Sequence, residues 1–370
     1  MKKTLAAVAV LGAFAGSALA ADVTLYGVID TGLNWTQTKT TGSSAVDKFS
    51  MASGQNSGAR WGLRGTEELG DGWKVGFNLE SAFNGDDGTM EKRLFHRESL
   101  LFVQSPYGEL SMGRTGALDA GTGRYNLMGS GATAMGTGWD KIGKSNKILL
   151  GTGDRMDNTV TYQSPAFAGV TVYAQASLKK DSTKADVAAV AATETTPAVT
   201  AKTYTEGSSD ADRYYALGAK FSAEGLNTGL VVSMNDYSRY DMTQKDDDGY
   251  TVSGYVNYDF GMVKPMLAAQ YWDGGKKDGV ATKGYGVVIG ATAPVFGGTL
   301  KATAGWNDAE YVEDNGTDLN NWMVGFGYEY KLSKRTTIYT AAGYTEEKTK
   351  AATTTKVKTS EVMAGLVHTF

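Results

Sequence analysis

One long stretch without a regular apolar period, TGALDAGTGRYNLMGSGATAMGTGWDKIGKSNKILLGTG (residues 115–153), decides how the rest of the chain is interpreted. Neither a two-residue nor a 3.6-residue repeat runs through it, so the stretch predicts a loop. Compact domains rarely contain a loop of about 39 residues unless the loop has a function. Short alternating segments lie on both sides of it, and regularly spaced strands around one oversized loop favour a barrel with that loop folded inside.

The flanking segments predict β-strands joined by two kinds of connection. The first, DVTLYGVIDTGLNW, places Val23, Leu25 and Ile29 on one face and polar or small residues on the other. Sixteen such segments can be counted. Short turns (LGDG, SPYG, PVFG) alternate with longer polar loops (SRYDMTQKDDDG, AEYVEDNGTDL, KTKAATTTKVK). This layout predicts an all-β fold, a 16-stranded antiparallel transmembrane β-barrel with the third outer loop folded into the lumen. A soluble β-sandwich is the alternative.

The alternation also predicts which face of each strand meets lipid. In RWGLRG, Trp61 and Leu63 share a face opposite Arg60 and Arg64, and in KVGFNLE the apolar Val75, Phe77 and Leu79 oppose Lys74, Asn78 and Glu80. The apolar faces should therefore point outward and the polar faces toward a water-filled lumen. Leu100 and Phe102 are expected to face lipid, which turns Arg97 inward but Glu98 outward, unless a β-bulge lies near Glu98.

The N-terminus and the composition predict an exported protein. MKKTLAAVAVLGAFAGSALA has a basic start, an apolar centre and a small-residue end, so residues 1–20 are expected to be a signal peptide and residues 21–370 the mature barrel. Without Lys2 and Lys3 the net charge changes from −4 to −6, which argues against nucleic-acid binding. The chain has no cysteine, and its 48 glycines and 39 aromatic residues fit many strands and tight turns. We expect no cofactor and no metal site.

Three motifs suggest other functions but lack the context that those functions need. GWDKIGKS (residues 138–145) matches a phosphate-binding loop, yet no apolar strand precedes it and no long helix can follow it. A hydrolase would have to use His96 or His368, the two histidines of the chain. The acidic segments KDDDG and EDNGTD lack the spacing of a calcium loop and are expected to be solvated turns. We therefore expect no enzymatic activity.

Several segments together resemble the general trimeric porins of Gram-negative outer membranes, closest to those of beta-proteobacteria. The resemblance covers nearly the whole mature chain and rests on the segments DVTLYGVIDTGLN, GARWGLRGTEELGDGWKVGFNLE, SMGRTGALDAG, DRMDNTVTYQSP, KLSKRTTIYTAAGY and VMAGLVHTF. It implies an outer-membrane channel for passive diffusion of small hydrophilic solutes and ions. The alternatives are a substrate-selective porin and a barrel that acts mainly as an adhesin or surface receptor.

The resemblance also implies a pore constriction in which a basic wall faces an acidic loop. Alternation independently turns Arg60 and Arg64 inward, and Arg155 shares a face with Asp157. The candidate site residues are the wall arginines Arg60, Arg64, Arg97, Arg114 and Arg155, the loop acids Asp119 and Asp140, and the terminal Phe370 as an assembly signal. The implied partners are two further copies in a homotrimer, outer-membrane lipid and lipopolysaccharide, and the barrel-assembly machinery. Residues 180–210 have no period and are expected to form a mobile outer loop.

Overall fold

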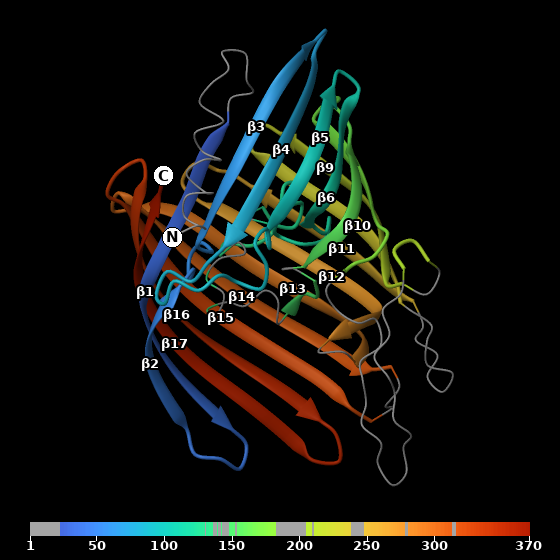
Figure 1. The fold of residues 1–370 in the computed structure, drawn as a ribbon. Helices are drawn as coiled ribbons and strands as arrows, with labels where there is room; N and C mark the ends of the chain where they lie inside the picture. The colour runs from blue at the N-terminus through green and yellow to red at the C-terminus, as the bar shows by residue number, and fades with distance from the viewer. Residues whose placement is uncertain are drawn as a thin grey trace, which may run out of the picture.

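The computed structural model of the chain is a closed antiparallel barrel (Figure 1). It describes residues 23–129, 131–135, 139, 142, 148–151, 154–182, 205–208, 211–237, 248–277, 280–312 and 316–370. Residues 1–20, expected to be the signal peptide, most of residues 180–210, expected to form an outer loop, and most of the GWDKIGKS motif lie outside the described residues. Among the residues that are described, no helix is long and apolar enough to cross a membrane.

Seventeen strand segments form the described wall. They are β1 (Thr24–Thr40), β2 (Val46–Ser53), β3 (Arg60–Gly70), β4 (Trp73–Ala82), β5 (Glu98–Ser105), β6 (Gly108–Gly116), β7 (Arg155–Gln163), β8 (Val170–Ser177), β9 (Arg213–Ala223), β10 (Leu226–Asp236), β11 (Gly249–Tyr258), β12 (Lys264–Lys277), β13 (Val280–Val295), β14 (Gly298–Tyr311), β15 (Asp318–Lys331), β16 (Thr336–Lys350) and β17 (Thr354–Thr369). Consecutive strands are hydrogen-bonded neighbours except β2 and β3, which both pair with β1, and β1 pairs with β17 to close the barrel.

The seventeen segments occupy sixteen positions around the barrel, because β2 and β3 share one of them. The C-terminal half of β1 pairs with β2, whereas its N-terminal half pairs with β3, from Val28 opposite Arg60 to Thr24 opposite Arg64. The predicted count of sixteen is therefore confirmed. VDKFSMAS was not among the sixteen predicted segments, but it is extended as β2 and places Phe49 and Met51 on the exposed face.

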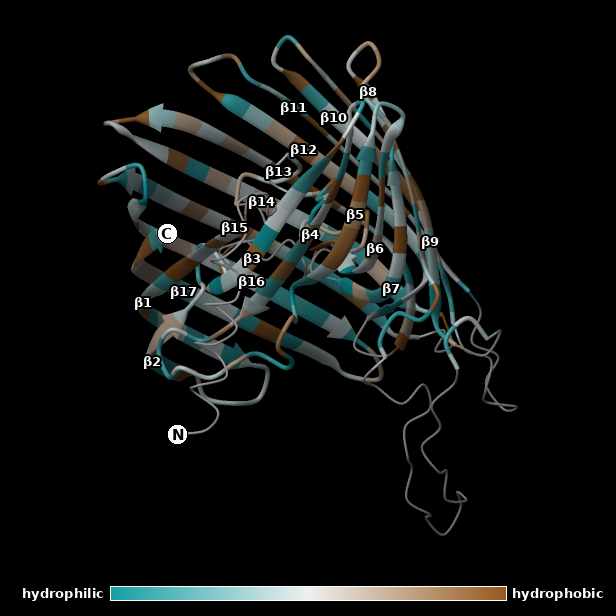
Figure 2. Cartoon of the chain, turned by 45° about the horizontal axis from the view of Figure 1, so that its top comes forward, coloured by the Kyte–Doolittle hydropathy of each residue, from teal (hydrophilic) through white to brown (hydrophobic). Residues whose placement is uncertain are grey.

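The apolar faces of the strands point outward, as predicted. Leu25, Ile29 and Leu33 of β1 are 56%, 43% and 48% exposed, whereas Asp30 and Asn34 of the opposite face are buried. Figure 2 shows the resulting alternation of hydrophobic and hydrophilic bands along the strands. A continuous exposed apolar surface of this kind is typical of a barrel surrounded by lipid.

β5 departs from the predicted orientation. Glu98, Leu100 and Phe102 are buried on its inward face, whereas Leu101 is 59% exposed on the outward face. The pairing of β4 with β5 is regular through Glu80 opposite Glu98, so no bulge is present there. Apolar residues occupy both faces of β5, and alternation alone could not identify the lipid side.

Residues 117–151, as far as they are described, pack against inward-facing side chains of the barrel in three apolar clusters, and Leu150 packs against a fourth. Leu118, Ala120 and Leu127 contact β7 to β10; Met128, Ile148 and Leu149 contact β11 to β15; and Met135, Trp139 and Ile142 contact β1, β16 and β17. Hydrogen bonds add to this packing, including Asn257 Nδ2 to the Gly131 carbonyl at 2.6 Å. No residue of β3, β4 or β5 belongs to the three clusters of described residues.

Short connections lie at one end of the barrel and the long ones mostly at the other, and the connection between β16 and β17 differs from the prediction. The segment KTKAATTTKVK was predicted to be a loop, but most of it belongs to β16 and β17, which are joined by three residues. Lys348 lies opposite Lys356 and Thr349 opposite Thr355 in this hairpin. Threonine is β-branched and favours extended pairing, so the strands continue well past the about ten residues that a membrane crossing needs.

Candidate functional site

Two of the predicted wall arginines share one carboxylate, that of Glu80. Arg60 begins β3, Arg97 directly precedes β5, and Glu80 lies on the inward face of β4 between them. The Nε atom of Arg97 is 2.5 Å from Glu80 Oε1, and the Nε atom of Arg60 is 3.5 Å from Glu80 Oε2. The Tyr26 hydroxyl donates a third bond to this carboxylate, at 3.0 Å. Glu80 therefore balances only part of the charge of this pair.

Arg155, the third predicted wall arginine, has no balancing partner among the described residues. It is the first residue of β7. Its Nε atom is buried without a hydrogen-bond acceptor. The charge of its guanidinium interacts with the charges of Arg97, Glu80 and Glu98. The structure thus brings Arg60, Arg97 and Arg155 into one cluster, here called the arginine cluster, and leaves the charge of Arg155 without an ion pair in the described part of the chain.

Arg114 is near the arginine cluster but its charge is neutralised. Its Nη1 atom lies 2.7 Å from Asp157 Oδ1, and its Nε donates to the His96 carbonyl at 2.7 Å. Asp157 also binds Arg93 at 2.9 Å, and Arg93 has a second carboxylate partner in Asp181 at 3.4 Å, so two arginines face two carboxylates here. Burial and the adjacent Arg114 lower the pKa of His96 to about 4, so its imidazole is neutral at pH 7. Arg114 therefore fastens the base of the loop to β7.

Arg64, the remaining predicted arginine, lies farther along β3, toward the short turn between β3 and β4. It is exposed, and its guanidinium carbon is 5.0 Å from the centroid of the Tyr26 ring. In the register of the barrel it lies opposite Thr24 on one side and Asn78 on the other. Arg64 is thus outside the arginine cluster and faces the lumen on its short-turn side.

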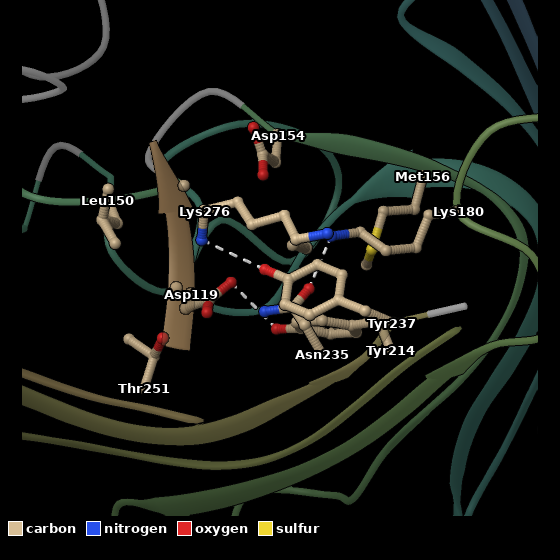
Figure 3. Close-up of a pocket in the computed structure, with 13 residues that line it drawn as sticks. Asp119, Leu150, Asp154, Met156, Lys180, Tyr214, Asn235, Tyr237, Thr251 and Lys276 are labelled. Carbon is tan, nitrogen blue, oxygen red and sulfur yellow. Dashed lines mark hydrogen bonds between the residues drawn. The ribbon is translucent and has the colours of Figure 1, made fainter. Parts of the chain in front are cut away.

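Asp119 does not face the arginines, contrary to the prediction. Its carboxylate is buried against the opposite wall, where it accepts hydrogen bonds from Tyr214 at 2.9 Å and from Ser233 at 2.6 Å. Figure 3 shows it beside Tyr214, on the border of a cavity of about 120 Å³ that Lys276 also lines. Burial raises the pKa of this carboxyl. The difference arises because the inward hydroxyls of Tyr214 on β9 and Ser233 on β10 bind this carboxylate and hold it away from the arginines. Asp140, the other predicted acid, lies outside the described residues.

The acids near the arginine cluster belong to the wall. Besides Glu80, Glu98 points inward, where it accepts a hydrogen bond from Asn78 and another from Thr115 at 3.0 Å. The alternation of β4 contained the signal for Glu80, since it placed Glu80 on the polar face. Glu98 was missed because Leu100 and Phe102 were expected to face lipid.

The described residues contain no group of histidine, cysteine or carboxylate side chains arranged to hold a metal ion. The two aromatic residues of the loop are also not presented to the lumen. Tyr125 is buried and donates to Ser111 at 2.5 Å, and the Trp139 ring packs edge-on against Tyr339, with centroids 5.4 Å apart. The candidate site therefore consists of charged groups rather than of exposed aromatic rings of the loop.

The phenyl ring of Phe370, the predicted assembly signal, covers Gly27 on the outward face of β1. The two residues exchange backbone hydrogen bonds of 3.1 Å in both directions. A Cβ atom added at Gly27 would lie 2.3 Å from the Phe370 ring, so this close contact requires glycine. Phe370 thus completes the pairing that closes the barrel.

Comparisons with known proteins identify the family of the chain. The sequence signature of the family described as Gram-negative porin matches residues 6–350. An outer membrane porin protein of Bordetella pertussis is 31% identical, with complete coverage of both chains. Outer membrane porin protein 32 of Delftia acidovorans is 28% identical, over 100% of this chain and 95% of its own length.

Solved structures share the fold. An anion-selective porin from Comamonas acidovorans superposes with a TM-score of 0.67 at 23% identity, covering 95% of this chain and 100% of its own. The outer membrane channel DcaP of Acinetobacter baumannii also reaches 0.67, at 16% identity, covering 96% of this chain and 99% of its own. The chain therefore belongs to the Gram-negative porin family and forms an outer-membrane β-barrel channel for the passive diffusion of small hydrophilic solutes and ions.

Proposed function

We propose that this porin is a general diffusion channel with a weak preference for anions, set by the arginine cluster. The observation that carries the proposal is the excess of positive charge on this part of the lumen. Arg60 and Arg97 share Glu80, and Arg155 has no ion pair in the described part of the chain. Even with Glu98 counted as ionised, three guanidinium groups face two carboxylates. The mature chain is acidic as a whole, but salt screens charges that lie farther from the permeating ion than about 8 Å at physiological ionic strength.

We propose that the loop narrows the lumen because it packs against the wall from β7 to β17. The path that remains runs past β3, β4 and β5, where the arginine cluster lies. Charges on opposite sides of a narrow aqueous path orient water and penalise apolar solutes. Because the acid Asp119 is bonded to the opposite wall, the field at the constriction comes mainly from the arginine cluster with Glu80 and Glu98.

A general channel is favoured over a sugar-selective one. A sugar-selective channel needs aromatic rings exposed along the path, and the rings of Tyr125 and Trp139 are buried in contacts with the wall. Because the chain belongs to a family of channels, we propose no catalytic role for it.

We further propose the processing and partners of the mature protein. Cleavage after Ala20 would leave residues 21–370 as the barrel domain, with Phe370 read by the barrel-assembly machinery. The exposed apolar band would contact outer-membrane lipid and lipopolysaccharide. A homotrimer is supported by one similar structure, an outer membrane protein of Vibrio cholerae described in a trimer form, with a TM-score of 0.60 at 15% identity and coverage of 95% of this chain and 100% of its own.

Solute flux through purified protein tests the general channel. Liposomes containing the porin should swell in neutral sugars at rates that fall steadily with solute size. Empty liposomes are the control. Rates equal to those of empty liposomes would overturn the channel, and a rate that is high for one sugar and saturates with its concentration would overturn the general channel in favour of a selective one.

A further inference from the structure

A second basic site lies in the lumen, on the short-turn side of the arginine cluster. Inward side chains of β1, β3, β4 and β5, together with Arg124 from the loop, line a cavity of about 640 Å³. Arg60 lies at the border of this cavity, and Arg64 and Gln104 lie closer to the short turns that end β3 and β5. A cavity of this size can hold a small hydrated solute.

The charges that line the cavity are predominantly positive. Arg64 has no carboxylate partner among the described residues, and its guanidinium is supported only by the Tyr26 ring. Arg124 forms a bidentate ion pair with Glu109, with Nε to Oε1 at 2.6 Å and Nη2 to Oε2 at 2.7 Å. Its guanidinium carbon is 3.9 Å from the centroid of the Phe102 ring. Arg60, the third guanidinium, shares Glu80 with Arg97.

Arg64 has the chemistry of a binding group rather than of a structural one. A guanidinium presents a planar fork of N–H donors that matches the two oxygens of a carboxylate or a phosphate. The cation–π contact with the Tyr26 ring, at 5.0 Å from the guanidinium carbon to the ring centroid, does not occupy the N–H donors of this fork. The exposed Gln104 side chain is in the same cavity, on the inward face of β5, and can donate a further hydrogen bond.

We propose that Arg64, with Gln104 and Arg124, forms a weak subsite for small oxyanions, namely carboxylates and phosphate, on the short-turn side of the arginine cluster. This inference rests on the proposed anion preference. An anion that crosses the constriction then occupies two positions in turn, one at the arginine cluster and one at the subsite around Arg64. Transport past such a subsite saturates, whereas transport through a featureless pore rises linearly with concentration.

The test measures single-channel conductance of the full-length mature protein against concentration, in sodium acetate and separately in sodium phosphate. Wild-type conductance should saturate, and Arg64→Gln should raise the half-saturating concentration about fivefold, as expected for the loss of one partly hydrated ion pair. Arg64→Lys keeps the charge but loses the planar fork, and should give an intermediate value. Arg335→Gln is the matched control, because Arg335 is an exposed arginine in the short turn between β15 and β16 and does not line the cavity.

The outcomes separate this inference from the general channel. Saturation in acetate but not in phosphate would assign the subsite to carboxylates, and the reverse result would assign it to phosphate. A linear dependence in both salts, or equal half-saturating concentrations for the wild type and Arg64→Gln, overturns the subsite while leaving the anion preference in place. A cation preference of the wild type in potassium chloride overturns both. If Arg64→Gln fails to assemble, Arg64→Lys still provides the comparison.

Discussion

Replacing Glu80 with glutamine should increase the anion preference of the channel, because Glu80 is the carboxylate that two arginines of the cluster share. Its oxygens lie 2.5 Å from Arg97 Nε and 3.5 Å from Arg60 Nε. Glutamine keeps the size of the side chain and can still accept a hydrogen bond, but it removes one negative charge. Arg60 and Arg97 then act on a passing ion without compensation.

The size of the effect follows from the distance between the removed charge and the permeating ion. Across about 8 Å, one unit charge contributes roughly 0.5 kcal/mol in bulk water and about 2 kcal/mol at an effective dielectric constant of 20. Thermal energy is about 0.6 kcal/mol, and salt screens charges beyond about 8 Å at physiological ionic strength. We therefore expect the ratio of anion to cation permeability to rise about two- to fivefold.

The assay is the reversal potential of purified channels in a potassium chloride gradient, compared between the wild type and Glu80→Gln. Glu346→Gln is the matched control, because Glu346 lies opposite the outward-facing Trp322 and pairs with Lys356 at 3.1 Å, outside the lumen. The control should keep the wild-type reversal potential. An unchanged potential for Glu80→Gln, or a shift toward cations, would refute the assigned role of Glu80.

Three further predictions concern assembly and loop stability. Deletion of Phe370 should reduce the amount of folded barrel in the outer membrane, because its ring and backbone close β1 over Gly27; normal surface levels after rapid induction would show that the residue is dispensable. An unheated detergent gel should show a species near three times the monomer mass, and a monomer by light scattering in mild detergent would contradict the trimer. Because burial raises the pKa of Asp119, its ionisation destabilises the folded state increasingly as the pH rises from its unfolded value of about 4 through the folded pKa. Asp119→Asn should therefore unfold at the same or a higher temperature than the wild type at pH 7.5. Asp119→Ala should unfold at a lower temperature, because it leaves the Tyr214 and Ser233 hydroxyls without their acceptor. A loss of stability in Asp119→Asn equal to that in Asp119→Ala would contradict this assignment.

The fold could be predicted from the sequence wherever a strand has one apolar and one polar face. β1 is such a strand, and its Leu25 and Ile29 are exposed while Asp30 is buried, as alternation predicts. The prediction failed for β5, where Leu100 and Phe102 are apolar but face inward. The inward faces of several other strands are apolar because the loop packs on them, and a local pattern of residues carries no information about that packing.

The candidate site was predicted in part. Alternation and family resemblance identified Arg60, Arg97 and Arg155, which the structure brings together. Glu80, the acid that pairs with Arg60 and Arg97, was on a face predicted to point inward. The resemblance placed the acids of the constriction on the loop, so it gave no reason to expect one on the wall. The position of Asp119 depends on hydroxyls about 100 residues away in the chain, and only the folded structure brings these groups into contact.

The reversal potential of the wild-type channel in a tenfold potassium chloride gradient tests the central claim most directly. We expect a potential of the sign that indicates weak anion preference, and a shift toward cations in the triple variant Arg60→Ala, Arg97→Ala, Arg155→Ala. A cation-preferring wild type, or a triple variant with the wild-type reversal potential, would show that the arginine cluster does not control the ions that pass through the pore.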